Sequence, residues 1–163
     1  MMTRMISKIA TLGFLAAVAA VAASPASAQA TLDTVKKRGK VLCGVSPSSA
    51  GYSFADDKGV RQGFDSDVCR AISSAVFGAP DKVEFVPLNT NIRFQALQSG
   101  EIDVLSRQTT MTFSRDNSLG LDFGPVVFYD GQGLMVNAKL GVKSASELSQ
   151  AAICLLPGTT TLQ

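Results

Sequence analysis

Residues 40–45 read Lys-Val-Leu-Cys-Gly-Val, a short apolar run that predicts a buried strand. From position 65 to 77 apolar residues recur at helical spacing, and Gly78 and Pro80 end the pattern. Residues 83–88 form another apolar run and predict a second strand. A strand, a helix and a strand in this order predict two parallel strands joined by a helical crossover.

The same alternation continues on both sides of this stretch. Residues 91–99 predict a helix that Gly100 ends, and residues 102–106 predict a third strand. Before the first strand, residues 31–38 predict a brief helix that stops at Gly39. The whole order therefore predicts an α/β fold with a parallel sheet and helices on both of its faces.

The remaining sequence is less regular. Residues 126–129 and 133–136 are candidate strands around the turn signal Asp130-Gly131, and Ser144-Ala-Ser-Glu147 is a capping box that opens a short helix. Residues 152–156 predict a buried strand that runs into a Gly-Thr-rich turn. Such a turn normally starts a further βα unit. Either a partner supplies the missing layer or the sequence is a fragment of a longer one, and we favour the fragment.

The first 28 residues predict a secretory signal peptide. Arg4 and Lys8 precede an apolar stretch, residues 9–23, and Ala26-Ser-Ala28 is a small-x-small cleavage signal. The alternative is an uncleaved anchor, but the apolar stretch is shorter than the roughly 20 residues that a membrane-spanning helix needs. We therefore expect a soluble, exported mature protein.

The composition excludes several classes of function. A chain without histidine cannot form a Ser-His-Asp triad or a histidine-containing zinc site. The formal net charge is only +2 and there is no tryptophan, so neither a basic stripe nor an indole is available for nucleic acid. We expect no nucleic-acid partner, no metal and no cofactor.

Export to an oxidising compartment permits the cysteines to pair. There are three, Cys43, Cys69 and Cys154, so one must be left over, and none lies in a C-x-x-C motif. From these residues alone, one disulfide and three buried thiols are both open.

Four motifs, in order, resemble the signature run of periplasmic solute-binding proteins for amino acids. They are Gly63-Phe-Asp-Ser-Asp-Val68, Ala96-Leu-Gln-Ser-Gly-Glu-Ile-Asp103, Thr110-Met-Thr-Phe-Ser-Arg115 and Gly158-Thr-Thr-Thr161. Residues 104–110, 129–133 and 140–144 are more narrowly similar to the general L-amino-acid receptors of ABC transporters. The resemblance covers residues 31–163.

The resemblance implies the two-lobed α/β "Venus flytrap" of type II periplasmic binding proteins. On this sequence, residues 29–132 would form a nearly complete first lobe and residues 133–139 the hinge. Residues 140–163 would only begin the second lobe. In such proteins an amino acid is held in the cleft between the lobes.

The resemblance also implies ligand contacts. Arg115 matches the arginine that grips the ligand's α-carboxylate, a role that suits a planar guanidinium. Thr110 matches a residue that supplies hydroxyl and amide contacts to the same carboxylate, and Thr159 and Thr160 would add contacts from the second lobe. At Arg107 and Gln108, where many relatives carry small residues, only the backbone contact carries over. Plain helix or turn capping is the alternative for the threonines.

Departures from the family pattern predict broad specificity. Ser49 and Thr90 stand where single-amino-acid receptors place aromatic residues, and Ser46 replaces an acidic residue that often meets the ligand's ammonium. Tyr52 and Phe54 are candidates for lining the cleft, although burial in the lobe core fits them equally well.

Asp65 and Asp67 invite a paired-carboxylate interpretation, which we reject because Asp65 stands at a helix start, where an anion complements the dipole and caps free amides. A Cys43–Cys69 bridge that ties the first strand to the first helix is a more interesting hypothesis, with Cys154 left over.

The sequence thus predicts a monomeric periplasmic receptor that delivers L-amino acids to an inner-membrane ABC permease, with no chemistry of its own. The alternative is an enzyme that resembles the periplasmic cyclohexadienyl or arogenate dehydratases of the same fold. Such an enzyme needs a positioned acid in the cleft, and the sequence shows no carboxylate there with an obvious reason for a raised pKa.

Overall fold

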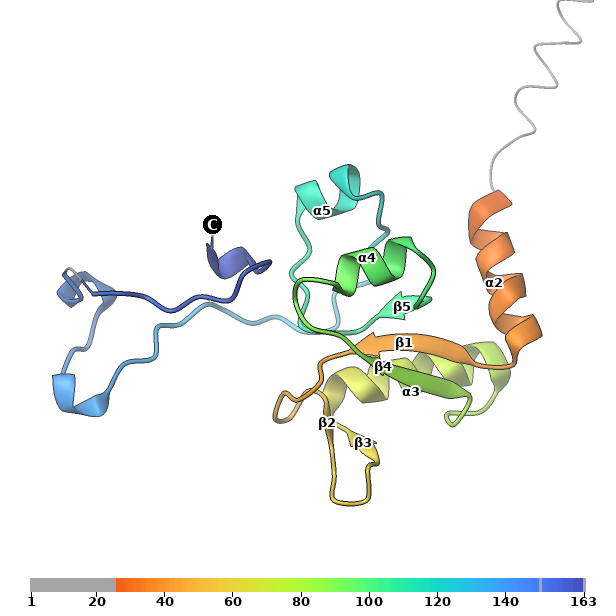
Figure 1. Cartoon of the computed structure of the whole chain (residues 1–163), viewed down its shortest axis with the longest axis horizontal. Helices are drawn as coiled ribbons and strands as arrows, with labels where there is room; N and C mark the ends of the chain where they lie inside the picture. Colours follow the sequence, from red (N-terminus) through yellow and green to blue (C-terminus); the bar gives the residue numbers. More distant parts are fainter. Residues whose placement is uncertain (1–25, 150, 163) are drawn as a thin grey trace, which may run out of the picture.

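The computed structural model describes residues 26–149 and 151–162 (Figure 1). The expected signal peptide therefore lies almost entirely outside the described residues. Helix α2 spans Ala26–Arg38, so it begins earlier than the sequence pattern predicts and ends where expected, before Gly39. Within the described ranges, no helix is long and apolar enough to cross a membrane.

The centre of the fold is a parallel sheet of three strands. Its strands are β1 (Val41–Val45), β4 (Val83–Pro87) and β5 (Val104–Leu105), in the order β4-β1-β5. Strand β1 pairs with both neighbours in parallel, with Cys43 opposite Phe85 on one side and Val104 on the other. The crossover helices are α3 (Phe64–Phe77) and α4 (Arg93–Gln98). The predicted α/β fold with a parallel sheet is confirmed.

The two faces of β1 pack against different helices. Cys43, Val41 and Val45 form one buried cluster with Cys69 of α3 and Val35 of α2. On the other face, a second cluster joins Leu88, Ile102 and Ala96 of α4. Gly44 allows this second packing, because a Cβ there would come within 2.6 Å of the Ile102 side chain. Helices cover both faces of the sheet, as the sequence predicts (Figure 1).

A disulfide joins the sheet to its first helix. Cys43 of β1 and Cys69 of α3 are bonded, their Cα atoms are 6.1 Å apart, and both residues are fully buried. This is the pairing that the sequence analysis put forward. Cys154 is free and exposed.

A small hairpin, which the sequence patterns did not indicate, lies between β1 and α3. Its strands β2 (Phe54–Ala55) and β3 (Arg61–Gln62) pair antiparallel, and the hairpin points away from the parallel sheet (Figure 1). Gly63 follows at φ 108°, and a Cβ there would lie 2.6 Å from the Tyr52 backbone. The chain therefore needs glycine where it passes from the hairpin into α3.

The predicted strands at 126–129, 133–136 and 152–156 are wrong. Those residues are extended but belong to no sheet, since every described strand pair lies in β4-β1-β5 or β2-β3. An apolar run becomes a strand only beside another strand that accepts its backbone hydrogen bonds. Beyond β5, the described residues form only short helices: α5 (Phe113–Ser118), η1 (Ala138–Leu140), η2 (Ala145–Glu147) and η3 (Thr160–Leu162).

The capping box at Ser144 is only partly correct. The Ser144 hydroxyl accepts from the Ser146 N–H, but Glu147 accepts from the Lys143 N–H at 3.2 Å instead of reaching the Ser144 N–H. The result is the single 3₁₀ turn η2 and not a longer helix.

Candidate ligand-binding site

Arg115 faces the loop that follows β5. It lies on α5, a helix that begins after Thr112, whose side chain accepts the Arg115 N–H as an N-cap. One guanidinium NH₂ donates to the Thr110 carbonyl at 2.7 Å and the other to the Gly158 carbonyl at 3.3 Å. The side chain is partly buried, and burial lowers its pKa. Arg115 therefore lies between the two threonine-containing segments that the sequence analysis selected.

Those two segments also touch each other directly. The hydroxyls of Thr110 and Thr160 are 3.1 Å apart, in hydrogen-bond distance. Gly158, at φ 74°, packs so closely that a Cβ would lie 3.1 Å from the Thr90 carbonyl. The turn at residues 157–161 thus lies against the ends of β4 and β5, where parallel strands place ligand-binding loops.

Arg93 is a candidate site residue that the sequence analysis missed. It lies on α4, is 2% exposed, and donates to the Gly158 carbonyl at 3.0 Å. Its guanidinium also lies over the Phe94 ring, 4.7 Å from the centroid, as does that of Arg115 at 5.1 Å. The sequence places this arginine between Ile92 and Phe94 in a predicted helix, but only the tertiary structure shows that it is buried.

The electrostatics of this edge favour an anion. The pKa of Arg93 is lowered to about 10, first by burial and then by the neighbouring charges of Arg107 and Arg115. Burial likewise lowers the pKa of Arg107. The negative charge of Asp65 raises this pKa, but by less. Arg93 is repelled by two neighbouring guanidiniums and shares one neutral carbonyl with Arg115. A carboxylate would stabilise such an environment.

Asp65 differs from its predicted role. It is 5% exposed, and burial raises the pKa of its carboxyl, against the opposing effects of the Gln108 backbone N–H and of Arg107. It does not cap α3, whose N-cap Gly63 has no side-chain cap bond; its carboxylate lies beside the Gln108 N–H, which lowers the pKa of that carboxyl. The sequence analysis gave no reason for a raised pKa at Asp65, and its burial supplies one.

The other predicted site residues are more scattered. The Gln108 side chain donates to the Ser49 hydroxyl at 2.9 Å, which joins the loops after β5 and β1. Thr159 donates to the Leu156 carbonyl at 2.7 Å, a local turn contact. Ser46 is buried at the end of β1, and its carbonyl accepts from Arg61. The structure thus brings Arg115, Thr110 and Thr160 together, while Thr159 and Ser46 make contacts elsewhere.

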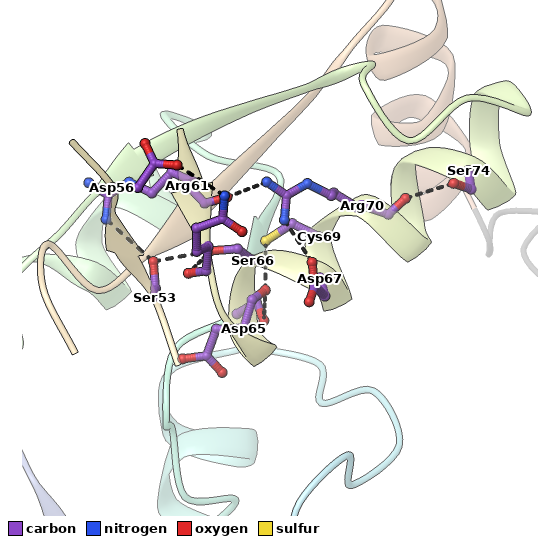
Figure 2. Close-up of polar contacts among 11 residues, drawn as sticks. Ser53, Asp56, Arg61, Asp65, Ser66, Asp67, Cys69, Arg70 and Ser74 are labelled. Carbon is purple, nitrogen blue, oxygen red and sulfur yellow. Dashed lines mark hydrogen bonds and ion pairs between the residues drawn. The ribbon is translucent and has the colours of Figure 1, made fainter. Parts of the chain in front are cut away.

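The loop after β1 is held by the hairpin. Arg61 donates to the carbonyls of Ser46 at 2.9 Å and Pro47 at 2.8 Å and lies 3.4 Å from the Ser53 hydroxyl. Figure 2 shows Arg61 between Ser53 and Arg70, which in turn donates to the Arg61 carbonyl. This network gives Ser46 and Ser49 a fixed backbone.

The two aromatic residues that the sequence analysis selected lie in different surroundings. Tyr52 packs against the rings of Phe64 and Phe128, with centroids 6.5 and 5.8 Å away. Phe54 lies in β2 of the hairpin and is partly buried. Tyr52 therefore attaches the segment around Phe128 to the start of α3, and no aromatic contact links either residue to Arg115 in the described chain.

Taken together, the site is a row of guanidiniums and hydroxyls at the carboxyl edge of a parallel sheet, with a glycine-threonine turn against it. Such an arrangement binds a carboxylate through charge-assisted hydrogen bonds. The described residues contain no group of three His, Cys, Asp or Glu side chains that could hold a metal ion.

These features combine a parallel α/β sheet with a group of guanidiniums at one of its edges. Residues 41–153 match the family of bacterial extracellular solute-binding proteins, family 3. The chain belongs to this family.

Several similar proteins have curated names. The chain is 56% identical over 136 residues to the glutamate/glutamine/aspartate/asparagine-binding protein BztA of Rhodobacter capsulatus. It is equally identical, over the same length, to the general L-amino acid-binding periplasmic protein AapJ of Rhizobium johnstonii. Each match covers 83% of this chain and 40% of the relative. The chain therefore spans about two fifths of the length of these relatives.

A solved structure supports the fold. The periplasmic binding protein of an ABC transporter from Brucella ovis, with glutathione bound, superposes with a TM-score of 0.77 at 55% identity. The match covers 80% of this chain and 41% of that protein. The chain is thus part of a periplasmic-binding-protein fold.

Proposed function

We propose that this chain is the amino-terminal part of a periplasmic receptor that binds L-amino acids with broad specificity. The receptor delivers them to an inner-membrane ABC permease. The names of the relatives support the class of ligand, and the family supports the periplasm and the transporter. The expected monomer, the signal peptide over residues 1–28 and the lobe boundaries at 29–132, 133–139 and 140–163 are part of the same proposal.

One observation supports this proposal most directly. The Arg115 guanidinium lies between the Thr110 loop and the Gly158 turn, which come from the proposed first and second lobes. A ligand carboxylate at this position can replace the neutral carbonyls as acceptor and gain a charge-assisted pair. The hydroxyls of Thr110 and Thr160, one from each segment, can both donate to this carboxylate. Binding therefore favours the arrangement in which the segments approach each other.

The breadth of specificity follows from the walls of the site. Ser49 and Thr90 provide no aromatic surface to fit one particular side chain. Arg93 adds a second buried guanidinium, so we include amino acids with a second carboxylate among the ligands. The names of relatives include glutamate and aspartate, and the Brucella ovis protein holds glutathione, which agrees with this choice.

We propose no catalysis for this receptor. Asp65 is the buried acid near the site, and its carboxylate lies beside the Gln108 N–H. Incubation of arogenate or prephenate with the protein, followed by product detection, tests this point. Accumulation of an aromatic product would support the dehydratase alternative.

Isothermal titration calorimetry with individual L-amino acids tests the receptor proposal. We expect binding by the wild-type chain, and at least about tenfold weaker binding for Arg115→Lys, because an ammonium cannot reproduce the planar fork. Arg38→Lys is the matched control, since Arg38 lies on α2 and pairs with Asp103. The proposal fails if no amino acid binds, or if the two substitutions have equal effects.

A further inference from the structure

Residues 106–110, the loop that follows β5, are attached to α3 through a single residue. The Ser106 hydroxyl donates to the Asp65 carbonyl at 2.9 Å, and the Gln108 N–H lies beside the Asp65 carboxylate, whose pKa it lowers. The backbone and the side chain of Asp65 thus meet the loop at two positions, two residues apart. Asp65 is 5% exposed, so water competes little for these contacts.

The opposite side of the same loop provides the candidate ligand contacts. The Gln108 side chain reaches Ser49, the Thr110 carbonyl accepts from Arg115, and the Thr110 hydroxyl lies beside that of Thr160. We propose that Asp65 is a positioning residue, which holds loop 106–110 in the shape that presents Thr110 to the ligand and to Arg115. The part of this inference that concerns the ligand rests on the proposed function.

The support behind Asp65 is rigid enough for this role. Its own N–H donates to the Tyr52 carbonyl at 2.8 Å, and the next residue, Ser66, contacts Ser53. One turn further along, Cys69 is bonded to Cys43 of the central strand. Figure 2 shows Asp65 at the end of α3 opposite Ser74, with Ser66 and Ser53 beside it. A loop that contacts this turn of α3 is therefore held in a fixed position relative to the sheet.

The chemistry of the carboxylate suggests a clean pair of substitutions. Asp65 Oδ2 is buried and has no hydrogen-bond partner in the described chain. Asp65→Asn keeps an oxygen acceptor for the Gln108 N–H, whereas Asp65→Ala removes it. If Asp65 acts as an acceptor that positions the loop, asparagine should restore what alanine loses.

Asp67 offers a matched control in the same helical turn. It belongs to the same motif, but its side chain is 69% exposed and pairs with Arg70 on the surface. Asp67→Ala therefore removes a carboxylate from α3 without touching loop 106–110.

Amide hydrogen exchange, read residue by residue by NMR, tests the positioning without any ligand. In Asp65→Ala we expect the Gln108 amide to exchange at least about tenfold faster than in the wild type, since the buried oxygen acceptor beside this amide is lost. Exchange in Asp65→Asn and Asp67→Ala should stay near the wild-type rate, and the β1 amides should remain protected in all variants. Unchanged exchange at Gln108 in Asp65→Ala would overturn the inference.

Calorimetry with L-glutamine and L-glutamate then tests the consequence for binding. We expect Asp65→Ala to weaken the affinity about tenfold, with Asp65→Asn and Asp67→Ala close to the wild type. If the wild type binds neither ligand nor any other amino acid, the proposed receptor fails while the exchange result still decides the positioning role. If the wild type binds and Asp65→Ala binds equally well, the role of Asp65 in ligand presentation is wrong.

Discussion

Arg93 shows how a single residue can oppose stability and favour binding. It is almost fully buried, and none of the ion pairs among the described residues includes it. Its lowered pKa, about 10, means that the folded protein disfavours the charged form relative to the unfolded chain. This cost is fully present below pH 10, and therefore at neutral pH.

Replacing Arg93 should separate these two effects. For Arg93→Met we expect a higher melting temperature of the ligand-free protein, because an uncompensated buried charge is exchanged for an apolar side chain. We also expect weaker binding of L-glutamate, by about tenfold, because the second guanidinium is lost. Differential scanning calorimetry and titration calorimetry provide the two values. A lower melting temperature with unchanged affinity would contradict both expectations.

Asp65 is a buried acid, and its ionisation should make the stability of the protein depend on pH. Burial raises the pKa of its carboxyl above the ordinary 3.8, so the folded state holds this proton more tightly than the unfolded state does. The contribution of Asp65 to stability therefore falls as the pH rises from about 4 through the folded pKa. Arg107 faces the same carboxylate and keeps its charge throughout this range.

Urea unfolding of the wild type and Asp65→Asn between pH 3.5 and 7 measures this contribution. We expect the stability of Asp65→Asn, relative to the wild type, to increase with pH over this interval, because the amide does not ionise. Asp67→Asn, at an exposed carboxylate in the same helical turn, is the control substitution. A difference that stays constant with pH would mean that the Asp65 pKa is the same in both states.

The residues of the candidate site divide into those with a local signal and those without one. Arg115 and Thr110 lie in one short motif, and that motif is sufficient to select them. Asp65 also lies in a motif and Arg93 lies in none, and the importance of both depends on burial between elements distant in the sequence. Helical spacing in the sequence indicates which face of a helix is apolar. The charge state of a buried group depends on the elements that pack against that face.

At the scale of elements, the disulfide connects the two parts that define the site. It joins β1, whose end carries Ser46, to α3, whose first turn carries Asp65. The sequence separation of 26 residues makes the closed loop long enough for a substantial effect on the unfolded chain. Both half-cystines lie in the core cluster and not on the surface.

Removing this bond should lower stability measurably. For the double variant Cys43→Ala/Cys69→Ala we expect a loss of about 3 kcal/mol in the free energy of unfolding, from the greater entropy of the unfolded chain. Cys154→Ala, at the exposed free thiol, should leave the free energy unchanged. Guanidinium unfolding under non-reducing conditions measures both. Equal stability of the wild type and the double variant would show that the disulfide does not form in solution.

The central elements of the parallel sheet were predictable from their patterns, whereas the β2-β3 hairpin and the lack of strands beyond β5 were not. The strands β1 and β4 and the helix α3 match their sequence patterns within one or two residues. Residues 126–129 and 152–156 have an equally apolar pattern and form no strand. A pattern describes the side chains of a strand, but the hydrogen bonds that make it one come from another part of the fold.

At the scale of the whole molecule, burial is unevenly distributed. The two core clusters and every buried residue of the described chain lie between Val35 and Leu121. Beyond that point large apolar side chains are exposed, including Phe128, Tyr129, Met135 and Leu156. Phe128 alone among these four packs into an aromatic cluster, with Tyr52 and Phe64. The molecule is thus a packed lobe followed by a loosely attached segment, in line with the proposed boundary near residue 132.

Limited proteolysis tests this division directly. Cleavage requires a segment that opens easily, and exposed residues with few buried contacts open at the lowest free energy. With dilute chymotrypsin we therefore expect the first cuts after Phe128, Tyr129, Leu134 or Met135, and a resistant product that contains the Cys43–Cys69 bond. Phe128→Ala should speed the earliest cuts, because it removes the aromatic contact that holds this segment against α3, whereas Leu140→Ala, at an exposed site outside the cluster, should not. Early cuts inside residues 41–106 would show that the lobe is not an independent packed unit, and the boundary near residue 132 would have to be abandoned.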